Sequence, residues 1–168
     1  RIACHHPLLD AKYGIDPNDH SIVWSDGDLH KLIDSYVSAA RLAQQAGFRF
    51  VDVKACHGYL LHEFLSARSR KGEFGGDLKG RSRLLCSIVQ RIRDECPGLL
   101  IGVRLSIYDT VPYETSLAVG EPMDFSAHLP YRLGFGVDEE NPLEMNLEEP
   151  LLLLEDLRQL GVAMVNLS

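Results

Sequence analysis

Four side chains in this sequence could together bind and protonate an organic substrate. Lys54, His57 and Tyr59 follow one short apolar run, and Arg104 lies near the end of a second. An ammonium, an imidazole, a phenol and a guanidinium suit an electron-rich or anionic group that gains a proton. Arg104 is the most informative of the four, because a guanidinium inside an apolar strand needs an anionic or polar partner to offset its desolvation.

Each of these residues also has a structural interpretation. His57 could be a hydrogen-bonded core histidine, and Tyr59 could pack with its hydroxyl in water. Cys56, which lies between the candidates, is expected to act as a small buried apolar side chain. His57, His62 and Glu63 do not have the spacing of a helical zinc site, so we expect no metal site.

The candidates need elements that place them on one rim of the molecule. Apolar spacing, caps and glycine stops predict helices over 26–46, 60–67, 81–96 and 148–160, and strands over 48–53, 99–105 and 162–167. Helices that alternate with strands predict an α/β fold with parallel strands and right-handed crossovers. In such a sheet, ligands lie beyond the carboxyl ends of the strands, where these side chains fall. The pattern fits a portion of a (β/α)8 barrel or a small open sheet.

Two stretches carry little periodicity. Residues 1–24 are expected to be an irregular surface segment, and βα units occupy 25–168 with a long loop at 106–147. We treat 1–168 as one partial barrel domain. The basic residues between 68 and 83 are expected to form a solvated face.

Composition narrows the classes of partner. The 168 residues carry a formal net charge of −7, are 45% hydrophobic and include four cysteines. An acidic chain without a basic and aromatic run is not expected to bind nucleic acid, and no apolar stretch is long enough to cross a membrane. The cysteine spacing fits neither a disulfide framework nor a zinc site, which favours reduced thiols and a cytoplasmic location.

Motifs along the chain resemble the Old Yellow Enzyme family of FMN-dependent NAD(P)H oxidoreductases. The resemblance covers about residues 25–168, with a weak middle around 107–147. It is carried by Ala46-Gly47-Phe48, Val51-Asp52-Val53-Lys54-Ala55-Cys56-His57-Gly58-Tyr59-Leu60, Glu63-Phe64-Leu65-Ser66, Phe74-Gly75-Gly76-Asp77-Leu78, Gly102-Val103-Arg104-Leu105-Ser106 and Val165-Asn166-Leu167-Ser168.

The resemblance implies a (β/α)8 TIM barrel with FMN at the carboxyl ends of the strands, of which this chain would supply strands four to six. It implies NADH or NADPH as the reductant and a small-molecule substrate. Arg104 would contact the pyrimidine edge of the flavin, His57 would bind the substrate carbonyl, and Tyr59 would protonate the alkene carbon opposite the hydride.

One residue departs from the family pattern. Lys54 stands where the first carbonyl-binding histidine is usual, and a mobile ammonium orients a substrate differently from a ring. Two alternatives therefore remain, a Schiff-base barrel lyase that uses Lys54 and a non-catalytic interaction module. Because strands of the barrel are absent from this chain, we expect the isolated chain to be inactive and to self-associate, and we expect the full-length protein that contains it, the parent, to form a homo-oligomer.

Overall fold

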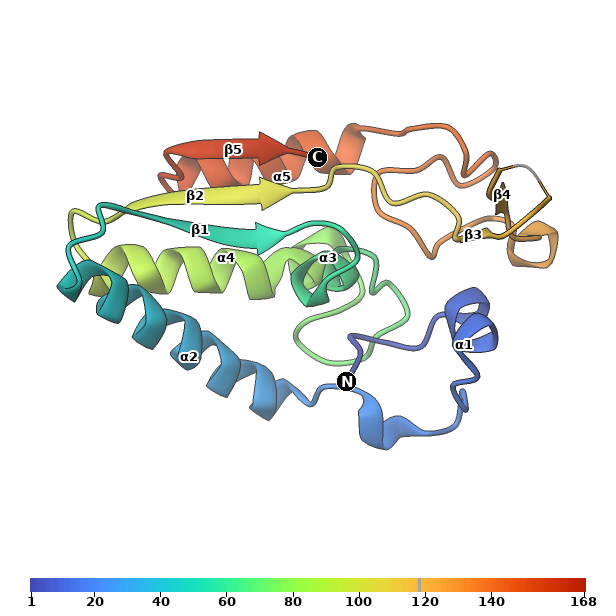
Figure 1. Ribbon diagram of the computed structural model, residues 1–168, viewed down its shortest axis with the longest axis horizontal. Helices are drawn as coiled ribbons and strands as arrows, with labels where there is room; N and C mark the ends of the chain where they lie inside the picture. Colours follow the sequence, from blue (N-terminus) through green and yellow to red (C-terminus); the bar gives the residue numbers. More distant parts are fainter. Residues whose placement is uncertain (118) are drawn as a thin grey trace.

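The computed structural model describes residues 1–117 and 119–168. Helices and strands alternate over most of the chain (Figure 1). In chain order the elements are α1 (Pro7–Tyr13), the 3-10 turn η1 (His20–Ile22), α2 (Asp26–Gln45), β1 (Phe50–Ala55), α3 (Leu60–Leu65), α4 (Leu78–Glu95), β2 (Leu100–Leu105), β3 (Tyr113–Glu114), β4 (Glu121–Pro122), η2 (Ser126–His128), α5 (Glu148–Gln159) and β5 (Met164–Leu167).

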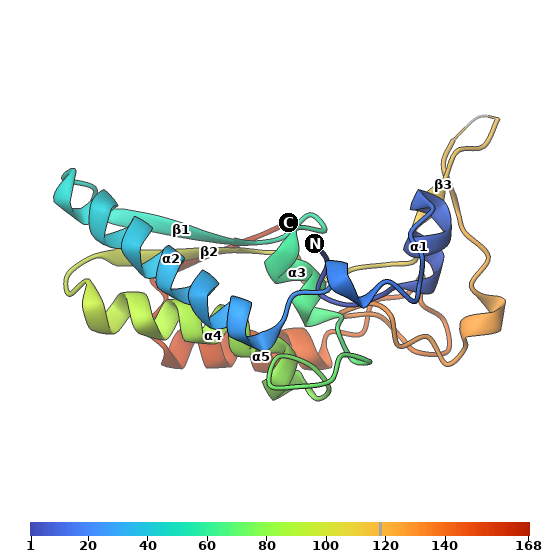
Figure 2. The ribbon, with the colours of Figure 1, turned by 90° about the horizontal axis from the view of Figure 1, so that it is seen from below.

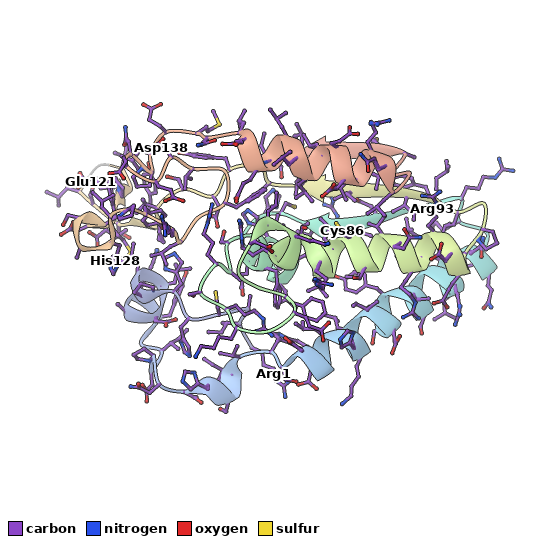
Figure 3. The ribbon with its side chains drawn as sticks, turned by 180° about the vertical axis from the view of Figure 1, so that it is seen from behind. Arg1, Cys86, Arg93, Glu121, His128 and Asp138 are labelled. Atoms are coloured by element: carbon purple, nitrogen blue, oxygen red, sulfur yellow. The ribbon has the colours of Figure 1, made fainter. Side chains whose placement is uncertain are left out.

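Three parallel strands form the main sheet, in the order β1-β2-β5. Helices α2, α4 and α5 lie along one face of this sheet, and in the part of the chain that is described no helix covers the other face (Figure 2). Seen from the helix side, Cys86 of α4 lies toward α5 (Figure 3). The α/β prediction is confirmed, and the core fills the space between the sheet and these helices.

The first long helix begins and ends as its sequence predicts. The Ser25 hydroxyl accepts a hydrogen bond from the Asp28 backbone N–H at 3.1 Å. At the other end, Gly47 has a φ of 89°, and the Phe48 N–H bonds to the Ala43 carbonyl at 3.0 Å. This is a Schellman motif, in which the backbone N–H of Phe48 ends the helix. The strand therefore begins at Phe50, and the prediction of 48–53 was two residues early.

The strands are buried on one face only. In β2 the side chains of Ile101, Val103 and Leu105 face the helices and are buried, whereas that of Arg104 is 43% exposed. The Arg104 side chain is therefore half-exposed in this chain, because the helices cover only the other face of β2 (Figure 2).

Helix α4 starts earlier than its apolar stripe indicates. The Asp77 carboxylate accepts the Gly80 backbone N–H at 2.8 Å, and this N-cap places the first turn at Leu78 rather than at residue 81. The extra turn buries Arg81, which is 1% exposed. The solvated-face prediction for the basic residues is therefore wrong at this position.

A buried charged junction surrounds Arg81. Its guanidinium donates to the Glu149 carboxylate at 2.5 Å, to the Gly76 carbonyl at 3.0 Å and to the Leu65 carbonyl. Arg68 contacts the same carboxylate at 3.0 Å. One cation thus joins the end of α3, the start of α4 and the start of α5.

The segments expected to be irregular contain short elements. Within 1–24, the His6 imidazole accepts the Leu9 N–H at 3.3 Å, Pro7 occupies the first turn, and Gly14 with a φ of 65° ends the resulting helix α1. The predicted loop at 106–147 contains the β3–β4 hairpin and η2. The segment with β3 extends beyond the sheet on the side away from the helices (Figure 2). Among the described residues, no helix combines the length and apolarity needed to cross a membrane.

Candidate functional site

The three strands carry a row of polar side chains near their carboxyl ends. Lys54 of β1 pairs in register with Arg104 of β2, which pairs in turn with Asn166 of β5. Partners in a parallel register point to the same side of a sheet. In β1 and β2 that side is the one away from the helices, because Val53 and Val103 fill the helix side.

An ion pair lies within this row. Arg104 Nε donates to Asp52 Oδ2 at 2.5 Å, with the two side chains 43% and 30% exposed. Asp52 is two residues before Lys54 and therefore shares its face of the strand. Arg104 is a candidate from the sequence and Asp52 is not, although the alternation of the strand places both Asp52 and Lys54 opposite the buried Val53.

Lys54 and Tyr59 are in direct contact. Lys54 Nζ lies 3.3 Å from the centroid of the Tyr59 ring, which is the geometry of a cation–π interaction. Lys54 is within β1 rather than after it, and Tyr59 is the N-cap residue of α3 and 61% exposed. The phenol therefore stands at the rim, beside the ammonium.

His57 lies on the connection between these two residues. It adopts a left-handed conformation with a φ of 58°, and its backbone N–H donates to the Ser106 hydroxyl at 3.1 Å. The Ser106 and Ser168 hydroxyls are 3.4 Å apart. The His57 side chain is exposed, and within the described residues no hydrogen bond joins it to Lys54, Tyr59 or Arg104. The structure thus groups three of the four candidates and places His57 nearby on the same connection.

A second histidine, His62 of α3, forms a hydrogen bond to this connection. His62 Nδ1 accepts the Gly58 N–H at 2.9 Å, while His62 Nε2 is buried and has no partner among the described residues. Burial lowers the pKa of His62. From the sequence, His62 is considered only as a metal ligand, although its four-residue spacing from Gly58 is compatible with a contact that holds the loop. Within the described part of the chain, no group of three metal-ligating side chains could hold an ion.

A small cavity lies between the N-terminal segment and α3. Its volume is about 200 Å³, and its walls include His6, Asp10, Glu63 and Asp109. Asp10 pairs with His5 at 2.7 Å, and the Glu63 carboxylate accepts the Ala3 N–H at 2.9 Å. Burial raises the pKa of Glu63 and lowers that of His6. The hydrogen bond from Ala3 to Glu63 joins the N-terminal segment to α3.

The sequence and the fold match known proteins. Residues 16–127 match the family model described as the NADH:flavin oxidoreductase / NADH oxidase family. 12-Oxophytodienoate reductase 1 of Oryza sativa subsp. japonica is 33% identical over 108 residues, which is 60% of this chain and 28% of that protein. The NADH-dependent flavin oxidoreductase iccE of Talaromyces variabilis is 42% identical over 82 residues, 47% of this chain and 20% of that protein.

A solved structure shows the same fold. The old yellow enzyme homologue from Zymomonas mobilis matches 86% of this chain with a TM-score of 0.58 and 23% identity, and the match covers 34% of that chain. The chain thus has the α/β fold of a part of that enzyme, and it spans less than a third of the length of these curated relatives. Since the family model covers more than half of the sequence, the chain belongs to the NADH:flavin oxidoreductase / NADH oxidase family.

Proposed function

We propose that this chain is the part of an FMN-dependent oxidoreductase that holds strands four to six of its barrel. The parent transfers a hydride from NADH or NADPH, through the flavin, to an activated alkene or a related electrophile. The observation that supports this most directly is the row formed by Lys54, Arg104 and Asn166 across three parallel strands, with Tyr59 against Lys54.

The donors in this row are compatible with a flavin. The pyrimidine edge of an isoalloxazine presents mainly acceptor atoms, to which Arg104 would supply donors, and Asn166 would supply both kinds of group. Arg104 would hold the flavin, which when bound supplies the hydride. Positive charge at this edge favours an anionic reduced form over a neutral one.

The remaining candidates act on the substrate in this proposal. His57 and Lys54 bind the carbonyl oxygen of the substrate, where negative charge develops, and Tyr59 supplies the proton from its rim position. The contact between Lys54 and the Tyr59 ring restrains an otherwise mobile ammonium. The substrate class is thus expected to differ from that of a site in which two histidine rings bind the carbonyl.

The lyase alternative finds less support in this arrangement. A Schiff base requires the amine nitrogen to be free to attack a carbonyl carbon, whereas Lys54 Nζ is held against the face of the Tyr59 ring, 3.3 Å from its centroid. Borohydride treatment with a carbonyl substrate would trap an adduct on Lys54 if the parent were a lyase. A parent that purifies without flavin would favour the interaction module.

The test is the absorption spectrum of the complete parent, followed by kinetics on variants. We expect bound flavin and NAD(P)H-dependent reduction of an activated alkene. Tyr59→Phe is expected to slow alkene reduction by about 10²-fold or more, while reduction of the flavin by NAD(P)H stays unchanged. Tyr113→Phe, which alters an exposed phenol on the hairpin, is the matched control. A colourless parent that does not take up FMN would refute the proposal, and equal rates for the two variants would refute the role of Tyr59.

The isolated chain is expected to bind FMN weakly or not at all, because other parts of the barrel contribute to the site. A stoichiometric, submicromolar complex with FMN would contradict this. The outer edges of β1 and β5 also favour self-association of the isolated chain, and the parent is expected to be a homo-oligomer. A stable monomer in concentrated solution, observed by sedimentation, would oppose self-association. The four free thiols support a cytoplasmic location.

A further inference from the structure

Two cations and one anion share the open face of the sheet near its carboxyl edge. Asp52 lies two residues from Lys54 along β1 and opposite Gly102 on β2. Its carboxylate nevertheless contacts Arg104, at 2.5 Å. The Lys54 ammonium instead lies over the Tyr59 ring, so the single carboxylate compensates one particular cation.

The form of this ion pair leaves most of the guanidinium available. The contact runs through Nε of Arg104, and the described residues make no other hydrogen bond to that side chain. A guanidinium has five donor hydrogens, of which four are on the two terminal nitrogens. A carboxylate at Nε therefore fixes the direction of the planar group while its outer edge remains free for a ligand.

The local backbone accounts for this choice of partner. Gly102 carries no side chain, and the Phe50 ring occupies the space beside it, where an added Cβ would come within 2.4 Å of the ring. Asp52 thus has an apolar ring on its amino side and Arg104 on its carboxyl side. In this chain the two side chains are 43% and 30% exposed, so their ion pair adds little to the stability of the fold. The effect of Asp52 therefore lies in the direction and the charge of the Arg104 guanidinium.

We propose that Asp52 is a positioning residue for Arg104, which aims the guanidinium at the bound flavin and cancels part of its charge, so that the reduction potential is lower than Arg104 alone would set. This inference rests on the proposed function. A positive charge at the flavin stabilises the anionic reduced form, and a nearby carboxylate opposes that effect. Asp52 therefore controls how readily the flavin accepts electrons, without touching the substrate.

The test is the midpoint potential of FMN in the parent holoenzyme. Asp52→Asn is expected to raise the ratio of affinities for reduced and oxidised FMN about tenfold, which is about 30 mV for a two-electron couple. Asp52→Glu keeps the charge and is expected to stay near the wild type. Asp34→Asn removes a carboxylate that pairs with Arg91 at 3.1 Å on the helix layer, and it should leave the potential unchanged.

The outcomes separate this inference from the proposed function. A parent without flavin refutes both. A coloured parent in which Asp52→Asn and Asp34→Asn have the same potential refutes only the role of Asp52, as does an equal loss of affinity for both forms of FMN. Asp52→Ser is a second neutral variant. If Asp52→Asn and Asp52→Ser both lose the far-UV circular dichroism of the folded protein, the ion pair is structural and the proposal is overturned.

Discussion

Replacing Arg81 with methionine is expected to lower the free energy of unfolding by about 4 kcal/mol. The change leaves the Leu65 carbonyl in the core without its hydrogen bond from Arg81, which costs about 2 kcal/mol. It also removes the hydrogen bond to the less buried Gly76 carbonyl, which costs about 1 kcal/mol. Loss of the ion pair adds about 1 kcal/mol. That last contribution is small because Glu149 is 25% exposed and keeps Arg68 at 3.0 Å.

The assay is urea unfolding, followed by circular dichroism and by the fluorescence of Trp24. With a slope of about 2 kcal/mol per M, Arg81→Met should lower the midpoint by about 2 M. Arg83→Met is the matched control on the same helix, because Arg83 is exposed and, among the described residues, donates only to the Glu73 carbonyl, at 2.8 Å. Its expected cost is about 0.5 kcal/mol. Equal midpoints for the two variants would show that the buried junction does not stabilise the fold.

Three further changes test other parts of the structure. In urea unfolding, Gly136→Ala should lower the stability more than Gly47→Ala. Both glycines have a positive φ, but of the two only Gly136 would place a Cβ against a backbone oxygen, that of Ile107 at 2.0 Å. Equal losses of unfolding free energy would contradict this. Burial lowers the pKa of His6 below 6.5, so the unfolded state takes up the proton first, and the stability present above pH 6.5 is lost as the pH falls. His6→Asn keeps an N-cap side chain and should reduce the change in the urea midpoint between pH 7.5 and 5.5. An unchanged pH dependence would exclude His6 as its source. Burial raises the pKa of Cys86 to about 11, so iodoacetamide at pH 8 should alkylate it much more slowly than free cysteine, and rapid labelling seen by mass spectrometry would contradict that burial.

Local patterns in the sequence predict most of the elements of this fold. The long helices have apolar spacing and caps that act within a few residues, such as Ser25 with Asp28, and the strands are continuous apolar runs. The errors have local causes as well. Phe48 counts toward a strand by composition but closes a helix through its backbone, and Asp77 starts α4 before its apolar stripe begins.

The candidate site is predictable only where it depends on position along a strand. Lys54 and Arg104 could be placed at one edge of a parallel sheet without knowing any register. The partner of Arg104 could not be predicted in this way, because Asp52 and Arg104 come into contact only in the register that pairs β1 with β2. Arg81 illustrates the same limit, since its partner Glu149 comes from a distant helix.

The parallel order β1-β2-β5 also governs how this chain can fold. Val53 pairs with Val103, and Val103 pairs with Val165, so each ladder joins residues separated by a whole crossover. Loop closure must precede any strand pairing, which slows folding relative to a helical bundle of similar length. Among the described residues, the β1–β2 ladder can form only after the crossover that carries α3 and α4 has been synthesised, whereas those helices can form from local contacts before then.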